Sequence, residues 1–225
     1  SNAQNNYQAS WFKSKSPSTS QRGIVETGTR DFKPNLDHGS GLSRMGMFSG
    51  IRTNMIIKKV TQLGNQIIRT RALRITDPKS KEVQRIIRNL IDSMRHHELV
   101  GMAAPQIWSN LRIFVSEIRV TKLRKYQSVK NVDELRVYIN PEIVSRSRKQ
   151  VIGYEGCGSV ASANLFGNVK RSENIVVLAQ DKSGNKFKLK ARGLLARVIQ
   201  HEHDHIEGIV FTDKSQALAD DGKGT

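Results

Sequence analysis

GLLARVIQHEHDHI, residues 193–206, is the most informative segment of the chain. Aliphatic residues recur in its first half at spacings that place them on one face of a helix. We therefore predict a helix from about Gly193 to Ile206. The buried face of this helix would carry four aliphatic side chains: Leu194, Leu195, Val198 and Ile199.

The second half of this segment carries a histidine pair at metal-binding spacing. His201 and His205 lie four residues apart, so both imidazoles lie on the same side of a helix and can bind one ion. Glu202 can reach a water on that ion as general base and later deliver the proton to a leaving amine, whereas His203 points elsewhere. The pattern favours metal-assisted hydrolysis, although the same spacing also arises by chance on a polar helix face.

A catalytic metal site needs a third protein ligand, and the chain offers two places for it. Downstream, the protease pattern HExxHxxGxxH is matched as far as Gly208, but its last position is Phe211, which leaves a downstream carboxylate as the alternative. Upstream, Cys157 stands between two glycines in EGCGS, residues 155–159. A lone cysteine is usually a small core residue, yet flanking glycines suit a ligand beside an oxyanion site.

The remaining pattern indicates an α+β fold. Asp77-Pro78 is typical of a helix start, and a helix of about 18 residues would follow with one buried stripe: Val83, Ile86, Ile87, Leu90, Ile91 and Met94. Four β-rich runs come next, the last two joined as a hairpin by a Gly-containing turn at 183–185: 112–118, 136–143, 175–180 and 186–190. This order favours antiparallel or mixed sheets packed around the helix 193–206 over alternating βαβ units.

The composition is that of a folded intracellular protein. Of the 225 residues, 37% are hydrophobic and 25% are charged, which is enough for one core of ordinary size. No run of about 18 apolar residues occurs, and nothing at the start resembles a secretion signal, so we expect no membrane-spanning helix. The single cysteine excludes an internal disulfide framework and fits a reducing compartment.

Three segments in this order, GMAAPQ at 101–106, EGCGS at 155–159 and QHEHDH at 200–205, resemble the signature motifs of the peptide deformylase family. The flanking segments 62–69 and 193–200 resemble the family as well, so the resemblance covers about residues 55–213. It implies a metal-dependent amidase, cytoplasmic in bacteria, that removes the formyl group from the N-terminal formyl-methionine of nascent proteins.

The resemblance also implies a metal-ligand set. Cys157, His201 and His205 would bind one divalent ion with a water in the fourth position, and Glu202 would act as general base and then as acid. One thiolate and two imidazoles leave an open position on a tetrahedral ion, which is typical of a catalytic site. The family uses Fe²⁺, while ligand softness alone also allows Zn²⁺, Ni²⁺ or Co²⁺.

Four further residues receive roles from the resemblance. Segment 100–106 could by itself be a simple loop, but the family pattern makes the Gln106 amide and the backbone N–H of Gly158 the donors to the tetrahedral oxyanion. Gly101 and Gly156 would lie along the peptide substrate, which the family binds as an added strand, with methionine in a hydrophobic pocket.

The sequence departs from the family pattern at three positions. The family usually has leucine where Gly158 stands, glycine where Leu99 stands and proline where Ala161 stands. None of these changes removes a ligand or the base, because the donor at residue 158 is a backbone group. We expect an enzyme whose rate or selectivity differs from the usual pattern.

We divide the chain into an N-terminal part (residues 1–54), a catalytic domain and a C-terminal tail. Ser1-Asn2-Ala3 resembles the scar that a protease leaves on removing an expression tag, and residues 4–54 lack apolar periodicity, which is typical of a flexible or loosely docked extension. An organelle-targeting role for this extension stays open, although its acidic residues argue against it. Residues 55–213 would form the peptide deformylase catalytic domain, and residues 214–225 a C-terminal tail.

The net charge of +17 suggests a polyanionic partner. Nine basic residues outnumber four acidic ones between residues 117 and 150, and a basic face there would attract ribosomal RNA to an enzyme that meets nascent chains. The nine are Arg119, Lys122, Arg124, Lys125, Lys130, Arg136, Arg146, Arg148 and Lys149. The alternative is a solvated basic surface without a partner.

Two other functions stay open from the sequence. A metalloprotease with the HExxH helix would take its third ligand downstream, so that mutation of Cys157 would leave the metal bound. A catalytically silent, basic RNA-associated protein with the same fold would bind RNA without hydrolysing formyl peptides.

Overall fold

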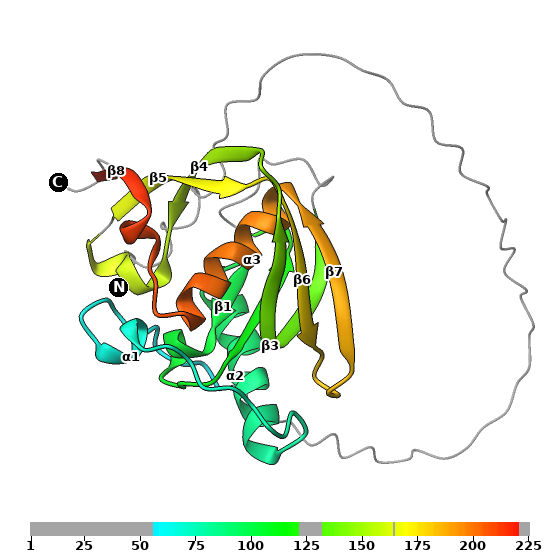
Figure 1. Cartoon of the computed structure of the whole chain (residues 1–225). Coiled ribbons are helices and arrows are strands. Elements are labelled where there is room, and N and C mark those ends of the chain that lie inside the picture. The colour runs from blue at the N-terminus through cyan, green and yellow to red at the C-terminus, as the bar shows by residue number, and fades with distance from the viewer. Residues whose placement is uncertain (1–55, 122–131, 164, 221–225) are drawn as a thin grey trace, which may run out of the picture. The chain divides into compact units, whose positions relative to one another are not determined.

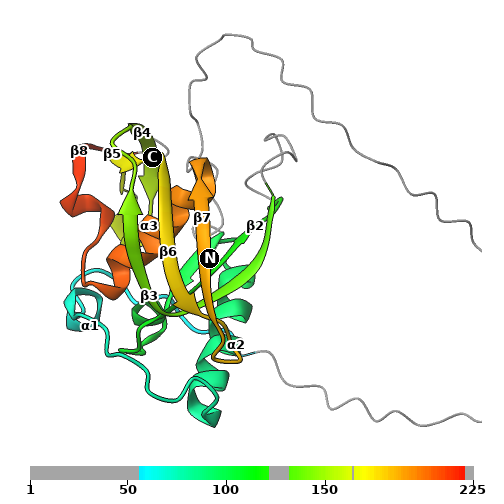
Figure 2. The ribbon, with the colours of Figure 1, turned by 45° about the vertical axis from the view of Figure 1, so that its right-hand side comes forward.

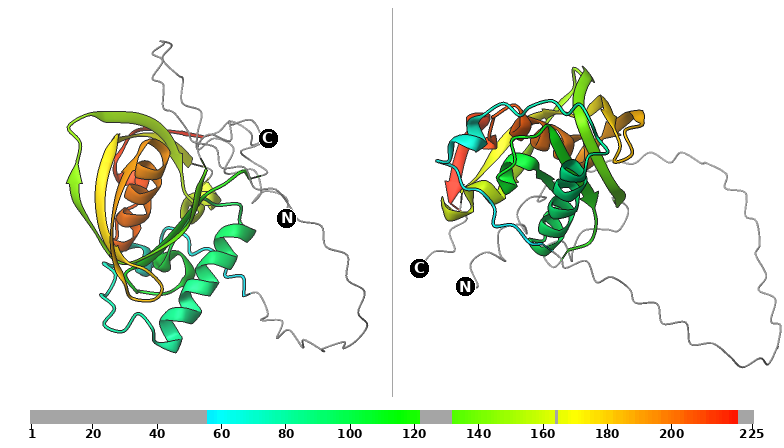
Figure 3. Two further views of the ribbon diagram at one scale, coloured as in Figure 1. Left: turned by 90° about the vertical axis from the view of Figure 1, so that its right-hand side faces the viewer. Right: turned by 90° about the horizontal axis from the view of Figure 1, so that it is seen from below.

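Helix α3 (Gly193–Ile206) lies between two antiparallel β-sheets (Figures 1 and 3). The computed structural model describes residues 56–121, 132–163 and 165–220. The larger sheet has the strand order β1 (Gly101–Ala103), β2 (Ile113–Ile118), β3 (Asp133–Arg146), β6 (Asn174–Gln180) and β7 (Lys186–Arg192). The smaller sheet has the order β4 (Gln150–Gly156), β5 (Leu165–Ser172) and β8 (Ser215–Asp220). The predicted α+β class is confirmed.

Helix α2 (Lys81–His96) exists as predicted, but its predicted start is wrong. Ser80, and not Asp77, is the N-cap, because the Ser80 side chain accepts a hydrogen bond from the N–H of Val83 at 3.3 Å. Asp77 instead forms a turn in which its carboxylate accepts from the N–H of Lys79 at 2.9 Å. Both residue types cap helices, and the sequence alone does not choose between them.

The four predicted strands are confirmed as β2, β3, β6 and β7, with ends that differ by a few residues. The predicted hairpin joins β6 to β7 through Gly184, whose φ of 82° suits glycine. Strands β1, β4, β5 and β8 were not predicted, because they are short or contain glycine and charged residues that weaken the alternating pattern. Strand β8 lies within residues 214–225, which the sequence analysis treats as a tail, and pairs with β5.

Short helices complete the described chain: α1 (Gln66–Arg69), η2 (Ala104–Ile107), η5 (Gly158–Ala163) and η6 (Phe211–Asp213). No helix in the described ranges is both long and apolar enough to cross a membrane. The predicted extension, residues 4–54, lies outside the described residues, so the division of the chain at residue 54 stays a prediction.

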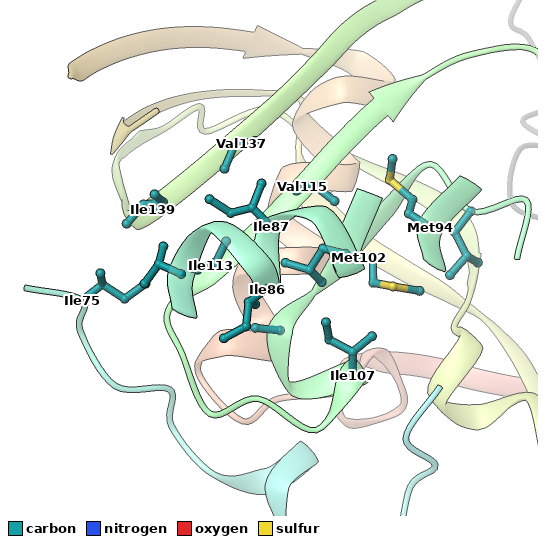
Figure 4. Close-up of a cluster of buried hydrophobic side chains, with 14 residues drawn as sticks. Ile75, Ile86, Ile87, Met94, Met102, Ile107, Ile113, Val115, Val137 and Ile139 are labelled. Atoms are coloured by element: carbon teal, nitrogen blue, oxygen red, sulfur yellow. The ribbon is translucent and has the colours of Figure 1, made fainter. Parts of the chain in front are cut away.

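The core lies on both sides of the five-stranded sheet. One cluster packs the buried stripe of α2 against β1, β2 and β3 and contains Ile86, Ile87 and Met94 together with Val115 and Ile139 (Figure 4). A second cluster packs α3 against the other part of the sheet and includes Phe114 and Tyr138, whose rings stack at 4.5 Å. Because α3 is covered from both sheets, even its polar C-terminal half is buried.

Candidate metal centre and active site

The second half of α3 presents its histidine pair to the protein interior. His201 and His205 are both buried, and their ring centroids lie 5.0 Å apart, as expected for residues one helical turn apart. His203, in contrast, is half-buried on another face of the helix, where its Nε2 lies 3.5 Å from a nitrogen of Arg112. The structure therefore separates His203 from the pair, as the spacing predicts.

Cys157 joins the two histidines from the other side of the site. It follows β4 directly, and its Sγ lies 3.1 Å from Nε2 of His205. The potential ligand atoms of Cys157, His201 and His205 all lie within 4.8 Å of one another, and no other such group of three occurs in the part of the chain that the structure describes. Two segments that are far apart in sequence thus converge on one point.

The downstream alternative for a third ligand finds no support in the described residues. Phe211, at the position where the protease pattern has its last histidine, stacks on the ring of His201 with centroids 6.4 Å apart. The nearby carboxylate of Asp213 accepts from the N–H of Val210 at 2.9 Å and pairs with Arg69. Both residues serve packing and ion pairing, so the ligand cluster depends on Cys157.

Glu202 lies beside the cluster without a hydrogen bond to its Oε2, which is buried. Burial raises the pKa of this carboxyl group well above its usual value, and the charges of Glu155 and Asp204 raise it further. Strand β1 passes so close that a Cβ atom on Gly101 would stand 2.5 Å from Oε1 of Glu202. Gly101 is therefore required for the packing of β1 against the candidate base.

Gln106 reaches the cluster from η2. Its Oε1 accepts a hydrogen bond from the N–H of Ala103 at 2.8 Å, which turns the amide nitrogen toward the cluster. That nitrogen lies 3.6 Å from Sγ of Cys157 and 3.4 Å from Oγ of Ser159. The segment that could have been a simple loop thus places an N–H donor beside Cys157.

Glu155 is a buried residue of this site to which the sequence analysis assigns no role. Its Oε2 lies 3.0 Å from Nδ1 of His201, which leaves the other ring nitrogen of His201 for the cluster. Arg171 donates two hydrogen bonds to the same carboxylate at 2.7 and 2.8 Å, and Arg197 donates a third at 2.6 Å. Burial alone would raise the pKa of Glu155, but Arg171 and the hydrogen bond with His201 hold it well below its usual range.

Arg171 extends this network to α3. It donates to Asp204 at 2.8 Å, and Asp204 also accepts from Lys214 at 2.6 Å. Arg197 lies over Gly153, where an added Cβ would stand 2.6 Å from the guanidinium carbon. The ion pairs of Glu155 and Asp204 with arginines join β4, β5 and α3, so no local sequence pattern predicts them. The one sequence signal for this network is the position of Glu155, two residues before Cys157.

The donor set fits a divalent transition metal. One thiol and two imidazoles are the ligand types that such ions prefer, and the carboxylate on His201 is the usual support for a metal-binding histidine. Burial raises the pKa of Cys157 to about 12 and lowers that of His205 well below its usual value. His205 is therefore neutral, as a metal ligand must be, whereas the Cys157 thiol keeps its proton until a bound cation stabilises the thiolate.

The family model described as polypeptide deformylase matches residues 57–221. The chain belongs to the polypeptide deformylase family. The members of this family are metal-dependent hydrolases that remove the N-formyl group from nascent polypeptides. The match to the family model confirms the family predicted from the three motifs.

Individual relatives agree with this assignment. The peptide deformylase of Dictyoglomus thermophilum is 36% identical over 160 residues, which cover 71% of this chain and 94% of the relative. Peptide deformylase 1 of Bacillus subtilis is 36% identical over 160 residues, which cover 71% of this chain and 91% of the relative.

Solved deformylase structures share the fold. A class I type b peptide deformylase from Acinetobacter baumannii with bound Met-Ala-Ser has a TM-score of 0.65 and 27% identity, covering 71% of this chain and 99% of the other. The peptide deformylase from Thermotoga maritima has a TM-score of 0.61 and 29% identity, covering 72% of this chain and 99% of the other.

Proposed function

We propose that this chain is an active deformylase that hydrolyses the formamide bond of N-formyl-methionyl peptides at the Cys157, His201 and His205 cluster. The observation that carries the proposal is the convergence of these three ligand atoms within 4.8 Å of one another, with the unpartnered carboxyl oxygen of Glu202 buried beside them. A silent relative would not need this arrangement of ligands and base, and a downstream-ligand protease would not use Cys157.

One divalent ion fits the three ligands, and we propose Fe²⁺, with Zn²⁺, Ni²⁺ or Co²⁺ as alternatives that the same donor set accepts. When bound, the ion lowers the pKa of a water and polarises the formyl carbonyl. Glu155 holds His201 through its Nδ1 atom, at 3.0 Å, and so orients this ligand.

Glu202 moves the protons of the reaction. Its carboxylate accepts one proton from the water whose oxygen adds to the formyl carbon. The same carboxyl group then delivers that proton to the methionine nitrogen as the C–N bond breaks, so that formate and a free amine are released. Burial suits this acid–base cycle, because it raises the pKa of Glu202 and so makes its carboxylate a stronger base.

Two N–H groups stabilise the negative charge that develops on the formyl oxygen. We assign this role to the Gln106 amide, which Ala103 orients at 2.8 Å, and to the backbone N–H of Gly158, the residue after Cys157. Removal of one such donor typically costs about 10²- to 10³-fold in turnover.

The peptide substrate lies along β1 and the end of β4 in this proposal. Gly101 belongs to β1 and Gly156 ends β4, so both border the cluster and can pair with an added strand. The Acinetobacter baumannii relative holds Met-Ala-Ser, which supports methionine as the first residue. We further propose that the enzyme acts in the cytoplasm on chains emerging from the ribosome.

The test is release of a free amine from formyl-Met-Ala-Ser by protein loaded anaerobically with Fe²⁺. Glu202→Gln should retain the metal yet lose turnover by about 10²- to 10⁴-fold, the range of a lost general base. Cys157→Ser should lose metal affinity, whereas a protease with a downstream ligand would keep its metal. Wild-type protein that binds metal but releases no amine would contradict the proposal, and full turnover in Glu202→Gln would remove Glu202 from it.

A further inference from the structure

Three of the five basic residues that the structure describes within the segment 117–150 form ion pairs. Arg119 pairs with Glu117, and Arg136 pairs with Asp133 at 3.0 Å. Lys149 pairs with Glu173. Four further members, Lys122, Arg124, Lys125 and Lys130, lie outside the described residues. The paired members of this segment are therefore poorly suited to bind a polyanion.

A different element carries unpaired cations. Strand β7 reads KFKLKAR, and its burial alternates so that Phe187, Leu189 and Ala191 pack inward. The opposite face of the strand presents four exposed cations: Lys186, Lys188, Lys190 and Arg192. Alternate side chains of a strand lie about 7 Å apart, so these residues form a straight row. We call them the β7 cation row.

No ion pair of the described residues involves the β7 cation row. Carboxylates on β3 and at the two ends of β6 already have partners. Glu142 pairs with Arg74 at 2.7 Å, and Glu173 pairs with Lys149 at 3.0 Å. Asp181, in the turn before β7, accepts from the N–H groups of Ser183 and Asn185. The positive charge of the row is therefore not neutralised within the described part of the protein.

Two members of the row, Lys190 and Arg192, line a groove at one end of β3, β6 and β7. The groove has a volume of about 370 Å³, and Lys190, Arg192 and Arg146 line it together with Asn174. Opposite the row, β6 contributes neutral residues: Asn174, Val176, Leu178 and Gln180. Lysine on an edge strand also prevents pairing with other sheets, but that role does not account for Arg146, which comes from the interior strand β3.

We propose that the β7 cation row and its groove bind the phosphate backbone of ribosomal RNA. A straight row of unpaired cations with hydrogen-bonding groups at one end matches a chain of phosphates, whereas an isolated anion would need only one of them. The choice of ribosomal RNA over other polyanions rests on the proposed function, because the substrate is a nascent chain. The row lies on the outer side of the sheet whose other face covers α3 (Figure 2), so the active site does not contribute to this contact.

The test compares two fourfold variants of the full chain. In the first, Lys186, Lys188, Lys190 and Arg192 are changed to Gln. In the matched control, four exposed cations at the start of α2 and along it are changed to Gln: Lys79, Lys81, Arg85 and Arg88. Both variants lose the same net charge. Binding is measured by anisotropy of a labelled RNA duplex over a salt series and by sedimentation with purified ribosomes.

The row variant should bind both RNA probes at least tenfold more weakly than wild type at moderate salt. The slope of log affinity against log salt should fall in magnitude by about 3, since each lost phosphate contact removes about 0.7 to 0.9. The control should keep most of the wild-type affinity and slope. Both variants should deformylate formyl-Met-Ala-Ser at the wild-type rate, which separates RNA binding from catalysis and reports an intact fold.

Three results would overturn the inference: absence of RNA binding by wild type, equal losses in both variants, or an unchanged affinity in the row variant. Vesicles with anionic lipid are the comparison polyanion. Row-dependent binding to vesicles without binding to RNA would assign the surface to a membrane instead.

Discussion

Glu155 is the residue on which the site geometry depends most. Its carboxylate holds His201, Arg171 and Arg197 at once, from a position with no solvent exposure. We predict that Glu155→Gln lowers metal affinity by about 10- to 100-fold, because His201 loses the carboxylate that orients its ring and raises its basicity. Competition with a fluorescent chelator measures this effect.

The matched control is Glu117→Gln. Glu117 also accepts hydrogen bonds from two arginines, Arg95 and Arg119, but it contacts none of the three candidate ligands. Its metal affinity should equal that of wild type. Equal affinities in both variants would show that Glu155 does not support His201.

Two glycines of the site should respond differently to alanine. A Cβ on Gly101 would stand 2.5 Å from Oε1 of Glu202 and 2.8 Å from a methyl group of Val198. A Cβ on Gly158 would meet Val60 at 3.4 Å and Leu99 at 3.6 Å, which are ordinary contacts. We predict that Gly101→Ala lowers the free energy of unfolding by about 1–3 kcal/mol, the cost of overpacking, whereas Gly158→Ala changes it by less than about 1 kcal/mol.

Urea denaturation of the two variants measures this difference. Gly101→Ala should also lose turnover, since displacement of a catalytic group by about 1 Å can cost 10²-fold. A Gly101→Ala protein with wild-type stability would mean that β1 and α3 separate at little cost.

At the scale of elements, the start of α2 depends on one hydroxyl group. Ser80 caps the helix through the N–H of Val83, whereas Asp77 closes only the preceding turn. We predict that Ser80→Ala lowers the free energy of unfolding by about 1 kcal/mol and that Asp77→Ala costs less than half of that. Thermal and urea unfolding of both variants measure the two losses. A larger loss of unfolding free energy in Asp77→Ala than in Ser80→Ala would mean that Asp77 is the N-cap, as predicted from sequence.

The elements also differ in how far sequence predicts them. Strands β6 and β7 alternate between buried and exposed residues, and a glycine turn joins them, so both were predictable. Strand β5 reads LFGNVKRS and buries Arg171, a residue type that a local pattern assigns to the surface. Its burial is stable because Glu155 and Asp204 come from β4 and α3 to meet it.

At the scale of the whole molecule, acid should destabilise the protein through its paired carboxylates. Neighbouring arginines lower the pKa of Glu117 from its usual value of 4.5, and the pKa of Glu142 and Asp213 is lowered as well. A lowered pKa means that the stabilisation is present above the unfolded pKa and is lost as pH falls through the folded one. The free energy of unfolding should therefore fall as pH drops below about 4.5.

A comparison of wild type with Glu117→Gln isolates one such group, since metal release at low pH affects both proteins alike. At pH 7 the variant should be less stable by at most about 1 kcal/mol, the range of solvent-screened ion pairs. This difference should shrink as the pH falls below the unfolded pKa of Glu117 and vanish once Glu117 is protonated in both states. Urea unfolding at several pH values measures it, and a difference that grows toward low pH would contradict the assignment.

The sequence by itself determined the α+β class, the helix 193–206, the family and the candidate ligands, because these follow from local spacing and from short motifs. Tertiary structure alone decided that Cys157 lies against His205, that Glu155 supports His201 and that the unpaired cations line β7. The physical reason is that burial and ion pairing join residues far apart in sequence. A charged residue's partner becomes known only when the chain has folded.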